Sequence, residues 1–195
     1  MKQILMIGAG SVGGFFGARL AKHHSHVSFL LRPNTLAAVK RNGLTIRSAE
    51  GTFSVRPQAS SDARDLPRPD LIVLGVKAYD LDEVLNQIEP VLSATTVILT
   101  LQNGIDTEDR LHARLHRDCV VGGVAYIYSK IAEPGVIDHY KKGAVAIGEL
   151  MGHESPRLLA IRDLFVSAGI PCHLSKDIRR SKWEKMCWNC VFNPI

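Results

Sequence analysis

The chain has 195 residues, of which 46% are hydrophobic and 22% are charged, with 16 glycines and 9 prolines. This balance is typical of a folded domain and excludes a disordered, collagen-like or low-complexity chain. The formal net charge is +5, but the basic residues are dispersed rather than gathered in a stripe, so no nucleic-acid partner is expected.

The first elements form a compact repeat of strand and helix. Residues 2–7 are predicted as a buried strand, followed by a glycine-rich turn, a helix over 15–22 and a second strand over 27–31. A βαβ unit of this length forces parallel strand pairing through a right-handed crossover. Asn34 is expected to cap a short helix over 35–40.

The same alternation continues to the end of the chain. The further expected elements are hairpin strands at 44–49 and 52–55, a polar loop at 60–69, buried strands at 71–76, 96–101 and 119–124, a second hairpin within 125–148, a short strand at 170–174, and helices at 81–88, 107–115, 156–168 and from about 181. This order predicts an α/β protein with a doubly wound, Rossmann-type, mostly parallel sheet and hairpin insertions. We expect this domain to span residues 1–175, and residues 176–195 to begin a helical domain that is cut short.

The sequence disfavours a membrane or secreted location, and it disfavours a redox or zinc site. No apolar run reaches the roughly 20 residues of a membrane-spanning helix, and the N-terminus lacks signal-peptide features, so a cytoplasmic protein without a membrane partner is expected. Cysteines are then expected to stay reduced. The pair Cys187 and Cys190 lacks both the setting of a redox motif and a second ligand pair for zinc, so no metal site is expected.

The glycine-rich turn carries the first functional motif, which comprises Gly8, Ala9, Gly10, Ser11, Val12 and Gly13. This is G-x-G-x-x-G between a predicted strand and a predicted helix, the context that a dinucleotide-binding turn requires. Gly8 allows the tight turn, Gly10 lets the backbone approach a pyrophosphate, and Gly13 allows close helix–strand packing. The free N–H groups of the helix N-terminus would bind the phosphates.

The end of the second strand indicates which nicotinamide cofactor binds. An NAD site places a carboxylate there, whereas this chain has Arg32. A guanidinium suits the 2′-phosphate of NADPH, with a solvated arginine as the alternative. Lys77 and Asn103 follow two later strands, so they face the expected ligand crevice: Lys77 near the cofactor phosphates or ribose, Asn103 near the nicotinamide ribose, or both in solvated loops.

The last predicted helix carries three polar side chains on one face. Lys185, Asn189 and Asn193 are spaced i, i+4 and i+8. Reducing a ketone needs a proton donor for the carbonyl oxygen and neutral groups that orient the substrate. A lysine with two carboxamides supplies both, unless the face is simply a polar stripe on a surface helix.

Together these motifs resemble the ketopantoate reductase (2-dehydropantoate 2-reductase) family over nearly the whole chain, and the segment 183–194 is the most specific signature. The resemblance implies NADPH-dependent reduction of 2-dehydropantoate to pantoate, a step towards pantothenate and coenzyme A. It implies Lys185 as proton donor, Asn189 and Asn193 as substrate ligands, Arg32 at the 2′-phosphate, and Lys77 and Asn103 in the cofactor cleft. The family's helical C-terminal domain would be mostly missing, so this length of chain is expected to bind NADPH but to turn over poorly.

Two other functions stay open on the sequence. One is another two-domain NAD(P)-dependent dehydrogenase acting on a hydroxy acid or a polyol phosphate, and the other is a non-catalytic NADPH-binding module. In each case the ligands are small molecules. Exposed Trp188 and Phe192 indicate association of this form of the chain, with a homodimer as the candidate assembly, but the sequence does not define the oligomeric state.

Overall fold

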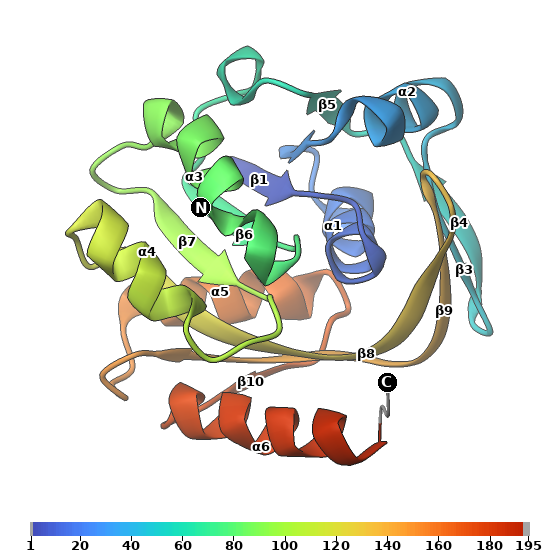
Figure 1. Cartoon of the computed structure of the whole chain (residues 1–195). Coiled ribbons are helices and arrows are strands. Elements are labelled where there is room, and N and C mark those ends of the chain that lie inside the picture. Colours follow the sequence, from blue (N-terminus) through green and yellow to red (C-terminus); the bar gives the residue numbers. More distant parts are fainter. Residues whose placement is uncertain (1, 193–195) are drawn as a thin grey trace.

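The computed structural model describes residues 2–192, which fold around one ten-stranded sheet (Figure 1). The strands are β1 (Ile4–Ile7), β2 (Val27–Leu30), β3 (Leu44–Ser48), β4 (Gly51–Val55), β5 (Gln58–Ser60), β6 (Leu71–Leu74), β7 (Val97–Thr100), β8 (Val120–Glu133), β9 (Val136–Glu149) and β10 (Cys172–Leu174). The α-helices are α1 (Ser11–His23), α2 (Pro33–Asn42), α3 (Leu81–Ile88), α4 (Thr107–Leu115), α5 (Pro156–Ser167) and α6 (Ile178–Phe192). Three short 3₁₀ helices, Ala63–Asp65, Ala78–Asp80 and Glu89–Val91, complete the secondary structure of this part of the chain.

Six strands form the parallel centre of the sheet in the order β5-β2-β1-β6-β7-β8. Leaving the β3–β4 hairpin aside, this is the doubly wound order 3-2-1-4-5-6 of dinucleotide-binding folds. Both predicted hairpins are present, as antiparallel pairs β3–β4 and β8–β9, and β3 joins β9 in parallel. The predicted doubly wound, mostly parallel sheet with hairpin insertions is therefore confirmed.

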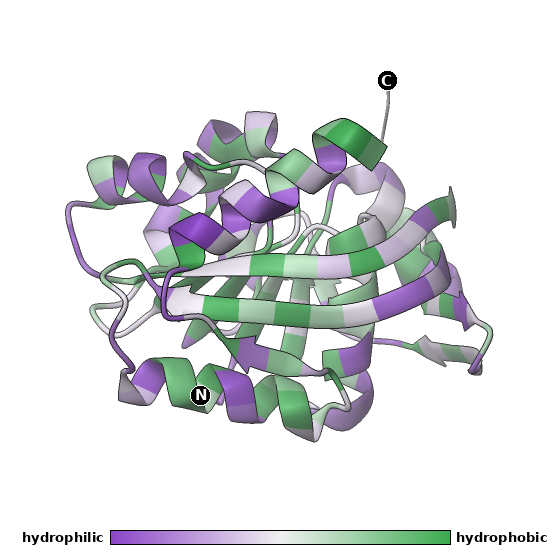
Figure 2. Cartoon of the chain, turned by 90° about the horizontal axis from the view of Figure 1, so that it is seen from below, coloured by the Kyte–Doolittle hydropathy of each residue, from purple (hydrophilic) through white to green (hydrophobic). Residues whose placement is uncertain are grey.

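Helices cover both faces of the sheet, as the nearly unbroken apolar runs of β1, β2, β6 and β7 predict. On one face Met6 lies in a cluster with Phe16 of α1 and Phe165 of α5. On the other, Leu5 lies in a cluster with Leu85 of α3. Figure 2 shows mostly hydrophobic strands inside the molecule, with hydrophilic residues gathered on helices and turns.

Several element ends differ from the prediction. Asn34 does not cap α2: Arg32 is the N-cap, without a side-chain bond to the helix, because Pro33 already has the φ of a first helical residue. The strand β5 was predicted as neither strand nor hairpin, because its three residues are too few for a pattern. Helix α6 begins at Ile178, three residues earlier than expected.

Helix α6 packs on the outer side of the β8–β9 ribbon, where small residues let it approach (Figure 1). A Cβ atom on Gly122 of β8 would lie 2.9 Å from Cγ1 of Ile178. A Cβ atom on Gly148 of β9 would lie 2.6 Å from the carbonyl oxygen of Ser175. The two glycines therefore fix the position of α6, and with it the lysine face predicted above. Over residues 2–192, no helix is long and apolar enough to span a membrane.

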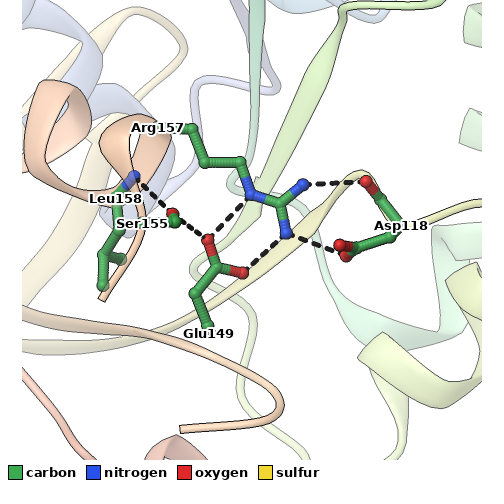
Figure 3. Close-up of polar contacts among 5 residues, drawn as sticks. All are labelled: Asp118, Glu149, Ser155, Arg157 and Leu158. Atoms are coloured by element: carbon green, nitrogen blue, oxygen red, sulfur yellow. Dashed lines mark hydrogen bonds and ion pairs between the residues drawn. The ribbon is translucent and has the colours of Figure 1, made fainter. Parts of the chain in front are cut away.

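A buried carboxylate ties α5 to the end of β9 (Figure 3). The side chain of Glu149 is only 2% exposed. It accepts hydrogen bonds from the Ser155 hydroxyl and from Arg157, whose Nε and Nη2 atoms lie at 2.8 and 2.6 Å. Arg157 also donates to the main chain and side chain of Asp118, each at 2.8 Å. One guanidinium thus donates to four oxygen atoms of two residues, and the ion pair with Glu149 raises the pKa of Arg157.

Replacing Arg157 with methionine is expected to lower the free energy of unfolding by about 3–5 kcal/mol, because it leaves Glu149 buried without its counter-charge. Arg162→Met on the same helix is the matched control. Arg162 forms an ion pair with the exposed carboxylate of Asp163, so its loss is expected to cost at most about 1 kcal/mol. Urea unfolding of both variants measures the difference, and equal midpoints would contradict a special role for Arg157.

Candidate active site

Two adjoining cavities lie beyond the carboxyl ends of the central strands. The larger, about 940 Å³, is lined by the glycine turn, the end of β2 and the loop after β6. The smaller, about 590 Å³, lies between the loop after β7 and α6. Gln102 and Asn103 line both cavities. A ligand in the larger cavity therefore meets a ligand in the smaller one at these two residues, which is the arrangement that a transfer between two molecules needs.

The glycine turn fits a dinucleotide phosphate. Gly8 has a φ of +83°, and a Cβ atom on Gly13 would lie 2.5 Å from the carbonyl oxygen of Gly8, so the fold itself requires both glycines. Gly10 differs, since the nearest protein atom to its Cβ would be the Gly75 oxygen, 3.9 Å away. Space is therefore left beside Gly10, at the N-terminus of α1, where no side chain caps the first turn. Such a helix end binds anions through its free N–H groups.

Arg32 lies at the wall of the larger cavity, but it is not an isolated cation. The Nη2 atom of its guanidinium lies 2.6 Å from Oδ1 of Asp80 and 3.9 Å from Oε2 of Glu83. The hydrogen bond and the charge of Asp80 raise the pKa of Arg32. The guanidinium has five N–H donors, so one carboxylate orients it without using all of them. Sequence reasoning missed Asp80, because the residue belongs to the loop after β6, 48 positions away.

Lys77 and Gln102 meet at the boundary between the cavities. Lys77 lines the larger cavity, and its main-chain oxygen accepts a hydrogen bond from Nε2 of Gln102 at 3.1 Å. The other amide atom, Oε1 of Gln102, is buried with no hydrogen-bond partner among the described residues. A buried acceptor without a partner is costly to a fold, so this oxygen suits a donor group on a ligand. Gln102 was not among the residues selected from the sequence.

Lys185 and Asn103 are brought into direct contact. Nζ of Lys185 donates to Oδ1 of Asn103 at 2.8 Å and to the carbonyl oxygen of Ala125 at 2.7 Å. Burial, and after it the positive charge of Lys182, together lower the pKa of Lys185 from 10.5 to about 8. An amine with this pKa exchanges protons readily near neutral pH, which is what a general acid needs.

The other two members of the predicted face have different outcomes. Asn189 lines the smaller cavity together with Lys185, as the helical spacing predicts. Asn193 lies outside the described residues. The two cysteines of the C-x-x-C pair, Cys187 and Cys190, are exposed free thiols, and Cys190 also lines this cavity. Within residues 2–192, no group of three or more His, Cys, Asp or Glu side chains is arranged to hold a metal.

The β8–β9 hairpin contributes a wall that the sequence did not indicate. Ser129 donates to the main-chain oxygen of Ser11 at 3.1 Å and so joins β8 to the start of α1. Lys130, the next residue, lines the larger cavity. Nothing in the local sequence marks these residues, because their position depends on how the long hairpin folds over the sheet.

Comparison with known proteins identifies a family. Residues 4–152 match the family model described as ketopantoate reductase PanE/ApbA. A curated 2-dehydropantoate 2-reductase from Nostoc sp. is 29% identical over 201 residues, covering 100% of this chain and 62% of the relative. One from Mesorhizobium japonicum is 31% identical over 215 residues, covering 99% of this chain and 66% of the relative.

Solved structures of the same family resemble this chain in fold. The crystal structure of 2-dehydropantoate 2-reductase from Geobacter metallireducens superposes with a TM-score of 0.91 at 32% identity, covering 98% of this chain and 64% of that chain. This chain therefore spans slightly less than two thirds of the length of the relatives that it matches.

Proposed function

Because the chain belongs to the ketopantoate reductase PanE/ApbA family, we propose that it provides the cofactor-binding half and one wall of the substrate site of an NADPH-dependent 2-dehydropantoate 2-reductase. The reaction reduces 2-dehydropantoate to pantoate, a step in pantothenate and coenzyme A synthesis. The observation that carries the proposal is the contact of Lys185 with Asn103 at the junction of the two cavities.

In this proposal the larger cavity holds the cofactor. The turn from Gly8 to Gly13 binds the pyrophosphate through main-chain N–H groups, Arg32 contacts the 2′-phosphate, and Lys77 and Asn103 contact the ribose end. The cofactor supplies a hydride when bound. The volume of the cavity, about 940 Å³, is supportive, because it falls at the upper end of the range usual for small-molecule sites.

The smaller cavity holds the 2-oxo acid. The ammonium group of Lys185 would donate the proton that the ketone oxygen takes up on reduction, and Asn189 and Asn193 would orient the substrate through their carboxamides. The lowered pKa of Lys185 supports this role, because a proton donor works best when its pKa lies near the working pH.

The direct test is to follow NADPH oxidation by this chain with 2-dehydropantoate and with a panel of other 2-oxo acids. Oxidation that depends on 2-dehydropantoate supports the proposal. Turnover only with another 2-oxo acid favours a different dehydrogenase of this fold. Tight NADPH binding without turnover of any substrate favours a binding module, or a requirement for the part of the relatives that this chain does not span.

NADPH selection has its own test. Arg32→Ala is expected to weaken NADPH binding by about 10-fold and to leave NADH binding unchanged. This is the lower end of the roughly 1.5–3 kcal/mol of a hydrogen bond to a charged group, because Asp80 already shares the guanidinium. Arg41→Ala, an exposed change at the far end of α2, is the control. Fluorescence titration measures both cofactors, and an equal loss for both would overturn the 2′-phosphate contact.

Two features of the proposal concern the whole protein. A domain boundary near residue 175 and a homodimer remain predictions. The exposed rings of Trp188 and Phe192, whose centroids lie 4.1 Å apart on α6, support association of this surface with another apolar surface.

A further inference from the structure

A buried ion pair lies one helical turn before the candidate proton donor on α6. Nζ of Lys182 on α6 contacts Oε1 of Glu108 on α4, and both side chains are only 4% exposed. The hydroxyl of Thr100, at the end of β7, donates to the same carboxylate oxygen. The main-chain N–H of Gly123 on β8 in turn donates to Thr100 at 3.3 Å. Three elements, α4, α6 and β7, therefore meet at one carboxylate, and β8 is joined to it through Thr100.

Stability alone does not account for this pair. Removing two charges from water usually costs about as much as their attraction returns, and well-packed apolar residues often serve a fold better. Helix α6 is also anchored elsewhere, by Ile178 in its own apolar cluster and by the partly exposed pair of Arg179 with Asp109 at 2.6 Å. Because these contacts already hold α6 in place, the buried pair of Lys182 and Glu108 is not needed for that purpose alone.

The position of Lys182 points to a role in the cavity. Lys182 precedes Lys185 by one helical turn, and both line the smaller cavity. Glu108 accepts a hydrogen bond from the ammonium group of Lys182 and is itself held by Thr100, so the positive charge of Lys182 has a fixed place one helical turn before Lys185. We propose that Lys182, held by Glu108, is a positioning residue that acts on Lys185 through its fixed positive charge and keeps the Lys185 amine against Asn103.

The charges around Lys185 support this assignment, which rests on the proposed function. On α6 the nearby ionisable groups are Lys182 and Glu184, and Glu184 is paired with Arg180 at 2.9 Å. On α4, Glu108 is taken by Lys182. From β8 the Ala125 carbonyl and the Tyr126 side chain face α6, and the loop after β7 presents the neutral carboxamide of Asn103. Burial comes first in lowering the pKa of Lys185, and the charge of Lys182 comes second.

The test reads the pKa of Lys185 directly rather than through turnover. Competitive acetylation with acetic anhydride across a pH series, followed by peptide mass spectrometry, titrates the amine of Lys185 in the folded chain. In the unsubstituted chain the pKa is expected at about 8. In Lys182→Met it is expected to rise towards 10.5, because the positive neighbour that helps to lower it is lost.

Three further variants make the result specific. Lys182→Arg keeps the charge and is expected to keep the lowered pKa. The double variant Glu108→Gln with Lys182→Met leaves no buried charge, so it folds where the single variant does not, and it is expected to show the same rise. Arg179→Met removes an exposed cation from the same helix and is expected to leave the pKa unchanged.

The outcomes separate this inference from the proposed function. An unchanged Lys185 pKa in folded Lys182→Met, or in the double variant, overturns the inference even when the chain reduces 2-dehydropantoate. A raised pKa in a chain that reduces no 2-oxo acid keeps the coupling of the two lysines and rejects the proposed reaction.

Discussion

Replacing Lys185 with methionine is expected to reduce the rate of 2-dehydropantoate reduction by about 10²–10⁴-fold, the usual contribution of a general acid. Methionine keeps much of the length and the apolar stem of lysine but has no proton to donate. Because Lys185 contacts Asn103 at the boundary between the cavities, the loss is expected mainly in kcat. NADPH binding, which uses the glycine turn and Arg32 at the other end of the larger cavity, is expected to stay within about 2-fold.

The pH profile gives the same proposal an independent check. A proton donor must be protonated, so the rate of reduction is expected to fall as the pH rises through about 8, the pKa of Lys185. The reverse oxidation needs the neutral amine and is expected to rise over the same range. Lys141→Met, an exposed change of the same type on β9, is the control and is expected to alter neither rate nor profile. A Lys185→Met protein with an unchanged kcat would remove the lysine from the reaction.

The fold was predictable because its signals are local. The apolar runs of β1 and β2 and the glycine turn between them lie within the first 30 residues, and each is interpreted from its neighbours in the chain. The candidate site was also predictable where all the residues of a pattern lie on one helix. Lys185 and Asn189 line one cavity because their i, i+4 spacing places them on one face of α6.

Contacts between distant elements were not predictable in the same way. The partner of Arg32 is Asp80, and the partner of Lys182 is Glu108, 74 positions earlier in the chain. Neither carboxylate stands out in its own helix or loop, because acidic residues near a helix start are common on any surface. Only the packing of α4 against α6, and of the loop after β6 against β2, turns these carboxylates into ligands of buried or oriented cations.

Gly10→Asp is expected to weaken NADPH binding by about 10²–10³-fold, the second largest effect, while leaving the fold as stable as before. Gly10 has a φ of −70°, which any residue adopts, and apart from its neighbours in the chain its Cβ would meet no protein atom nearer than 3.9 Å. Aspartate is also a favoured N-cap, so α1 gains rather than loses a partner for its first turn. The same carboxylate, however, occupies the N–H groups proposed for the pyrophosphate and repels its charge, at about 4 kcal/mol for charges roughly 4 Å apart at a partly exposed site.

Gly13→Ala provides the opposite pattern and completes the argument for the glycine turn. Its Cβ would lie 2.5 Å from the carbonyl oxygen of Gly8 and 3.2 Å from Cα of Gly75, both main-chain atoms that cannot turn aside. The variant is therefore expected to lose about 1–3 kcal/mol of stability, with cofactor binding falling because the turn is displaced. Urea unfolding and NADPH titration of both variants separate the two roles, because Gly10 is expected to matter for cofactor binding and Gly13 for the stability of the fold. Wild-type NADPH affinity in Gly10→Asp would place the phosphates somewhere other than this turn.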